Sequence, residues 1–90
     1  MESKGTFESK KNSNVYHIYG DRLVVHSGSD KKGITLPVDP KSFMYYLEFD
    51  HMYYEGEKLF VVVATRGSYD VRFEVDEDSL ELIGPPIQTY

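Results

Sequence analysis

The chain has 90 residues, of which 40% are hydrophobic and 28% are charged, and this composition is typical of one globular domain. It contains no cysteine, which excludes disulfides, thiol nucleophiles and thiolate metal sites and favours a cytoplasmic location. The net charge of −5 is uneven, because residues 1–33 carry +2 and residues 34–90 carry −7, and this acidity argues against a nucleic-acid partner. The N-terminus shows no signal-peptide pattern and no apolar run approaches the ~20 residues that span a bilayer, so we expect no membrane association.

Polar residues dominate the first segment. Residues 1–13 contain one large apolar side chain, Phe7, and show no period, so we expect a flexible polar tail. No Pro- or Gly-rich linker interrupts the rest of the chain. We therefore expect a single β domain over residues 14–86 and a short C-terminal tail over residues 87–90.

The first predicted element is a β-hairpin. The runs VYHIY and RLVVH flank Gly20-Asp21, a two-residue, glycine-first turn. This turn places Ile18 opposite Leu23. The apolar face, which we expect to be the core side, consists of Tyr16, Ile18, Leu23 and Val25.

A loop and a short strand are expected next. The composition of residues 27–33 predicts a loop, and residues 34–38 (ITLPV) read as a short strand that Pro37 confines to a sheet edge. Asp39-Pro40 is a helix-start signal. We expect at most one helical turn, around residues 40–44.

Residues 42–56, SFMYYLEFDHMYYEG, carry an unusual density of aromatic side chains. An alternation of two fits this stretch better than a helical period and predicts a strand. We expect its odd positions to face the core; they are Phe43, Tyr45, Leu47, Phe49, His51 and Tyr53.

Two further strands, LFVVVATR and YDVRFEV, flank Gly67-Ser68, which again suits a two-residue turn. This register places Val62 opposite Phe73. The predicted core face consists of Phe60, Val62, Ala64, Tyr69, Val71, Phe73 and Val75. Leu80 and Leu82 continue this face beyond the turn DEDS, and Gly84-Pro85-Pro86 ends the regular structure.

The predicted fold class is all-β, with one short helical turn at most. Short connections make neighbours in sequence neighbours in the sheet, so we expect an antiparallel meander of six to seven strands. A curled sheet of this size closes into an SH3-like barrel or folds into a small sandwich.

The second face of the aromatic strand and its partner is the candidate interaction face. It gathers Tyr46, Met52, Tyr54, Leu59, Val61 and Val63. A half-solvated sheet should alternate apolar and polar side chains, and this pair of strands does not, so something must cover it. Three covers remain open: the first hairpin of the same chain, a second copy in a homodimer, and a different protein.

The sequence motifs mainly exclude known kinds of catalytic and ligand-binding sites. Residues 28–35, GSDKKGIT, lack the lysine position and the helix of a phosphate-binding loop, and residues 74–81, EVDEDSLE, lack the ligand order of a calcium loop. We interpret His17 and His26 as surface histidines and His51 as a core histidine. We therefore predict no catalytic residue, no metal site and no cofactor.

The function that these observations favour is a small acidic protein-binding module, self-association included, and not an enzyme. One concrete form is an inhibitor or immunity-type protein for a basic partner. The alternative is a module that binds a small ligand or single-stranded nucleic acid through surface aromatics.

Overall fold

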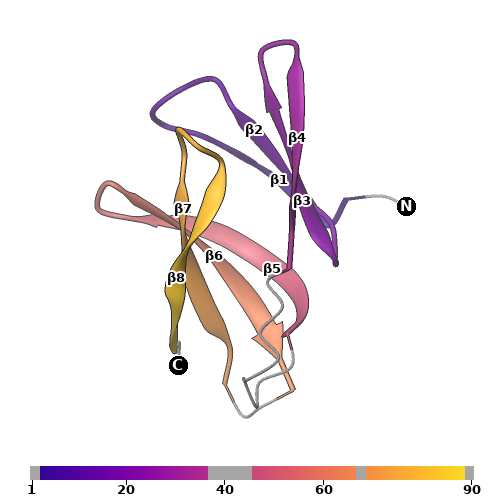
Figure 1. The fold of residues 1–90 in the computed structure, drawn as a ribbon, viewed down its shortest axis with the longest axis vertical. Helices are drawn as coiled ribbons and strands as arrows, with labels where there is room; N and C mark the ends of the chain where they lie inside the picture. The colour runs from indigo at the N-terminus through magenta and orange to yellow at the C-terminus, as the bar shows by residue number, and fades with distance from the viewer. Residues whose placement is uncertain (1–2, 37–45, 67–68, 89–90) are drawn as a thin grey trace.

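The structure is a computed structural model, and it describes residues 3–36, 46–66 and 69–88. The described residues form two antiparallel sheets of four strands each, joined in the orders β1-β2-β3-β4 and β5-β6-β7-β8 (Figure 1). The strands of the first sheet are β1 (Gly5–Glu8), β2 (Val15–Ile18), β3 (Arg22–Ser27) and β4 (Asp30–Thr35). Those of the second sheet are β5 (Tyr46–Glu55), β6 (Lys58–Thr65), β7 (Val71–Asp76) and β8 (Glu81–Gln88).

This architecture confirms the all-β class and changes its details. Eight strands in two sheets replace the six or seven strands of one meander, and the described strands do not close into a barrel. The helical turn expected around residues 40–44 and the turn at Gly67-Ser68 lie outside the described residues.

The first hairpin has the predicted register. Ile18 lies opposite Leu23 and Tyr16 opposite Val25, and the N–H of Tyr19 donates to the carbonyl of Arg22 across the turn (2.9 Å). The sheet then extends on both sides of this hairpin. Residues 30–35, mostly expected as loop, form β4, because an edge strand tolerates exposed lysines on a surface that no other strand covers.

The expected N-terminal tail contains a strand. Residues 5–8 form β1, which pairs with β2 so that Phe7 lies opposite Tyr16. The ring of Phe7 also lies 5.5 Å from the ring of Tyr54 (centroid to centroid). The one large apolar side chain of the N-terminal segment therefore packs against the core. At the other end of the chain, β8 runs to Gln88, past the prolines that we expected to end it, because an edge strand can lack N–H donors.

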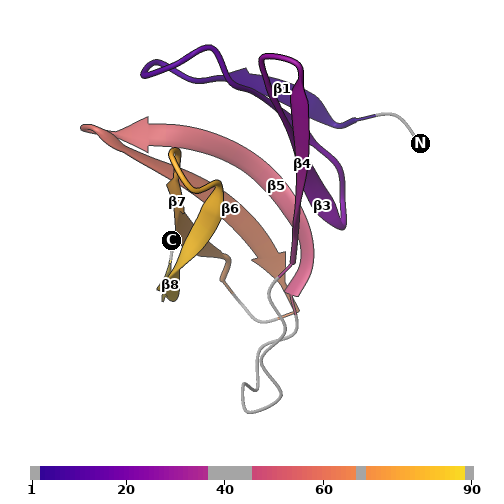
Figure 2. The same ribbon diagram turned by 45° about the horizontal axis from the view of Figure 1, so that its top comes forward.

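One hydrophobic core joins the two sheets. The first sheet contributes the predicted set, with Ile34 added from β4, and the second contributes alternating residues of β6 and β7 and two of β5. Figure 2 shows β5 curving along the first sheet, and the N–H of Phe49 donates to the carbonyl of Gly20 (2.9 Å) where the two sheets meet. Burial of the apolar faces of both sheets against each other therefore determines how the two sheets pack.

The register of β6 and β7 differs from the expected one by one residue. Val61, and not Val62, lies opposite Phe73, and Val63 lies opposite Val71. Side chains alternate along a strand, so this slip exchanges the two faces of β6. The core side of β6 consists of Leu59, Val61 and Val63.

Two irregularities in β5 explain why its odd positions do not all face the core. The register shifts between Tyr46 and Glu48 and again between Phe49 and His51. Each bulge reverses the alternation beyond it. Phe49 and Met52 are consequently both buried, although one is odd and the other even, whereas His51 is exposed and its Nδ1 is hydrogen-bonded to Asp50 (2.7 Å).

Candidate functional site

The candidate interaction face predicted from the sequence lies inside the molecule. Leu59, Val61 and Val63 are at most 1% exposed and Met52 is 7% exposed. Tyr46 and Tyr54 are half-buried and pack against the same core. The first sheet of the same chain covers this face, so the four buried residues, Met52, Leu59, Val61 and Val63, do not offer a surface to a partner.

The opposite face of the second sheet is covered by its own side chains. The guanidinium of Arg72 lies 4.1 Å from the ring centroid of Phe60, and Tyr53 stacks on that ring at 6.0 Å. Arg72 also donates to the Tyr53 hydroxyl (2.8 Å) and pairs with Glu55 (2.7 Å). The hydrogen bond to Tyr53 is the largest of the effects that raise the pKa of Arg72. Phe60 is thereby buried on a face that would otherwise be apolar and exposed.

A buried polar network lies where the N-terminal segment meets the second sheet. Glu77, directly after β7, is only 7% exposed, and its Oε1 accepts hydrogen bonds from the hydroxyls of Ser9 (2.6 Å) and Tyr54 (2.9 Å). The Ser9 hydroxyl accepts in turn from the N–H groups of Lys11 and Asn12. The network ties the segment after β1 to both β5 and β7, so that segment is held in place.

Two atoms of this region have no hydrogen-bond partner in the described residues: Glu77 Oε2 and the hydroxyl of Tyr16, both buried. Burial of Tyr16 raises the pKa of its hydroxyl, and the negative charge of Glu77 raises it further. The side chain of Asn14 acts in the opposite direction and lowers this pKa. A buried carboxylate oxygen without a donor is costly and calls for a physical reason.

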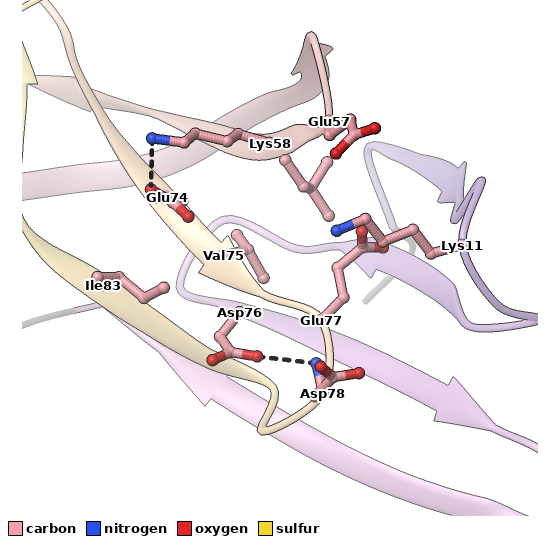
Figure 3. A pocket seen from close by; sticks show the side chains of 10 residues that line it. Lys11, Glu57, Lys58, Glu74, Val75, Asp76, Glu77, Asp78 and Ile83 are labelled. Carbon is pink, nitrogen blue, oxygen red and sulfur yellow. Dashed lines mark hydrogen bonds and ion pairs between the residues drawn. The ribbon is translucent and has the colours of Figure 1, made fainter.

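Beside Glu77 the surface is hollowed over a volume of about 340 Å³ (Figure 3). Its walls come from the segment after β1, the β5–β6 turn with the start of β6, the end of β7, and β8. The charged residues that line it are Lys11, Glu57, Lys58, Glu74, Asp76, Glu77 and Asp78. Five carboxylates against two ammonium groups give this acidic hollow an excess of three negative charges.

Local turns hold the walls of the acidic hollow. The β5–β6 hairpin closes through Gly56-Glu57, and Gly56 has a φ of +63°, in the region that glycine adopts without strain. After β7, Oδ1 of Asp76 accepts from the N–H groups of Asp78 (2.9 Å) and Ser79 (3.1 Å). These backbone hydrogen bonds, the one from Ser79 first, lower the pKa of Asp76 and keep it negative at the hollow.

The remaining candidates from the sequence do not form a site closed by three or more protein ligands. The rings of His17 and His26 lie 4.8 Å apart on the outer face of the first sheet. Among the residues that the structure describes, however, three or more acidic, histidine or cysteine side chains nowhere gather in a way that could hold a metal ion. The same described ranges contain no helix that is long and apolar enough to cross a membrane.

From sequence alone, the carboxylates of residues 74–81 read as a solvated turn. The signal that separates Glu77 from the others is its parity. Val71, Phe73 and Val75 alternate inward along β7, and Glu77 occupies the next inward position. A carboxylate on the core face of a strand is the pattern that could have marked this site.

Comparison with known proteins adds no relative: no protein-family model, curated protein or solved structure matches the chain. The geometry of the acidic hollow is therefore the basis for a functional proposal.

Proposed function

We propose that the chain is a small acidic protein-binding module that docks a basic partner protein at the acidic hollow. The observation that carries this proposal is the concentration of five carboxylates around one concave surface with only two ammonium groups. A concave surface lined by one sign of charge attracts and orients a partner of the opposite sign. An inhibitor or immunity-type protein of a basic target is the concrete form of this function.

The charge distribution of the whole chain supports a foreign basic partner. Residues 34–90, which include β5 to β8, carry −7, whereas residues 1–33 carry only +2. A second copy carries a net charge of −5 and therefore complements the hollow less well than a basic protein does. Binding of small ligands or single-stranded nucleic acid finds less support, since Phe60 lies beneath Arg72 and the body of the chain is acidic.

Calorimetric titration with designed peptides tests this function. The probes are nine-residue peptides that alternate serine with arginine, lysine or glutamate. We expect both basic peptides to bind with an affinity that falls as salt is added, and the glutamate peptide not to bind. Failure of both basic peptides to bind would contradict the proposal.

Paired variants locate the binding. Glu57→Gln with Asp78→Asn removes two charges from the hollow, whereas Asp21→Asn with Asp50→Asn removes two exposed charges that do not line it. Exposed charge pairs contribute ~0.2–1 kcal/mol each, so we expect the first variant to lose roughly two- to thirtyfold in affinity. The control should lose clearly less, and equal losses would show that only net charge matters.

A further inference from the structure

Two histidines stand side by side on the outer face of the first sheet. His17 of β2 lies opposite Val24, and His26 of β3 lies opposite Val15, so the two imidazoles are on neighbouring strands and diagonal to each other. Their ring centroids are 4.8 Å apart and their planes meet at 76°. Because the pairing of β2 with β3 fixes both backbones, the two rings are held together without any ligand.

The separation of the rings suits two imidazoles that bind one metal ion. Zinc lies about 2.0–2.1 Å from an imidazole nitrogen, and at such a bond length a metal ion is about 3.2 Å from the ring centroid. Two rings bound at angles between square-planar and tetrahedral then have centroids about 4.5–5.3 Å apart. The observed 4.8 Å falls within that range.

The nitrogens of both rings are available as ligands. Neither His17 nor His26 makes a hydrogen bond or an ion pair with another described residue, and the one contact of each ring is with the other ring. A neutral imidazole binds a metal ion through the lone pair of one nitrogen. The third histidine, His51, differs, because its Nδ1 is hydrogen-bonded to Oδ2 of Asp50 (2.7 Å).

The surroundings of the pair leave it accessible. The two rings are on the face turned away from the second sheet, and His17 is half-buried while His26 is exposed. Gly33 of β4 leaves room beside them, since a Cβ built there would meet nothing within 4 Å. Glu8 of β1 and Lys31 of β4 flank the pair with opposite charges, which offset one another.

We propose that His17 and His26 form an open site for a divalent transition-metal ion, with copper(II) the preferred ion. In the described ranges no acidic, histidine or cysteine side chain joins them as a third ligand, so water fills the remaining positions. Among the divalent first-row metals, copper(II) has the highest affinity for nitrogen ligands, and it accepts them in a square-planar arrangement. The site shares no residue with the acidic hollow and does not depend on the proposed partner.

Calorimetric titration of the full chain with copper(II) chloride, in a buffer that does not bind metals, tests this site. We expect His17→Gln and His26→Gln each to weaken binding by about tenfold or more, since even the loss of an outer partner of a metal ligand typically costs about 10–100-fold in affinity. The matched control is His51→Gln, an identical change at an exposed histidine outside the pair. Its affinity for copper(II) should equal that of the unmodified protein.

Amide resonances of the unmodified ¹⁵N-labelled protein locate the ion and do not depend on the folding of any variant. Copper(II) is paramagnetic and broadens the resonances of nearby nuclei, so we expect intensity to be lost first around His17, Val24 and His26. Equal affinities of the three folded variants, or broadening that spares residues 15–17 and 24–26, would overturn the metal site. The two rings would then be an aromatic pair only, and the proposed binding of a basic partner would stand unchanged.

Discussion

At the scale of single residues, Glu77 connects the fold to the proposed function. Glu77 occupies the next core-facing position after Val75, so its side chain is buried. The hydroxyls of Ser9 and Tyr54 stabilise its Oε1 by hydrogen bonds. Burying Oε2 without a hydrogen bond lowers the stability of the folded state. An apolar residue of similar size at this position would avoid that loss.

A substitution at Tyr16 tests directly whether its buried hydroxyl has a hydrogen-bond partner. Its hydroxyl is buried and has no partner in the described residues, so replacing Tyr16 by Phe removes an unsatisfied group and keeps the ring. We expect the free energy of unfolding of Tyr16→Phe to stay unchanged or to rise by about 1 kcal/mol. Urea denaturation followed by circular dichroism measures this change.

A loss of about 1 kcal/mol or more in Tyr16→Phe would contradict this expectation. It would mean that the hydroxyl is hydrogen-bonded, directly or through a buried water, and Glu77 Oε2 is the acceptor that the structure leaves open to it. Glu77 would then be satisfied from within the chain.

At the scale of elements, alternation along the strands predicts much of the fold and fails where the register is ambiguous. The first hairpin is predicted correctly, because its glycine-first turn fixes the pairing of Ile18 with Leu23. In β6, six apolar residues in a row, Leu59 to Ala64, make both faces look like a core, so a slip of one residue leaves no polar side chain misplaced. The pattern therefore wrongly favours Phe60 and Val62 over Val61 and Val63 as the core side.

Short edge strands are the other elements that the sequence pattern fails to predict. The strands β1 and β4 contain few apolar residues, and their pairing depends on a partner strand that sequence composition does not reveal. The candidate site escapes prediction for a related reason. Its walls come from Lys11, from the β5–β6 turn, from the end of β7 and from Ile83 of β8, and only the pairing of strands brings these segments together.

The corrected faces of β6 give a sharp pair of variants. Val61 is fully buried between the sheets, whereas Ala64 is half-buried on the opposite face and lies across from Glu48. Val61→Lys should unfold the chain, because burying an unpaired charge costs several kcal/mol of a total stability of ~5–15 kcal/mol. Ala64→Lys should remain folded, with its ammonium opposite a carboxylate.

Circular dichroism and size-exclusion chromatography distinguish these results. A folded Val61→Lys variant that elutes as a smaller species than the unmodified protein would indicate that a second copy covers this face. A folded Val61→Lys together with an unfolded Ala64→Lys would show that the faces are still reversed.

At the scale of the whole molecule, the two sheets have different roles. The first sheet covers the apolar face of the second, and the second carries most of the carboxylates that form the acidic hollow. The edge strand β8 contains Pro85 and Pro86, whose missing N–H donors limit pairing with another strand along that edge. The hollow is consequently a better candidate for specific binding than strand addition at β8.

The central claim is that a basic partner binds at the acidic hollow, and its most direct test is a map of chemical-shift changes. The ¹⁵N-labelled protein is titrated with the arginine nonapeptide and its amide resonances are followed. We predict that the changes concentrate around the residues that line the hollow, which are Lys11, residues 57–59, residues 74–78 and Ile83. Changes concentrated on the outer face of the first sheet, around His17 and His26, or no changes at all, would contradict the claim.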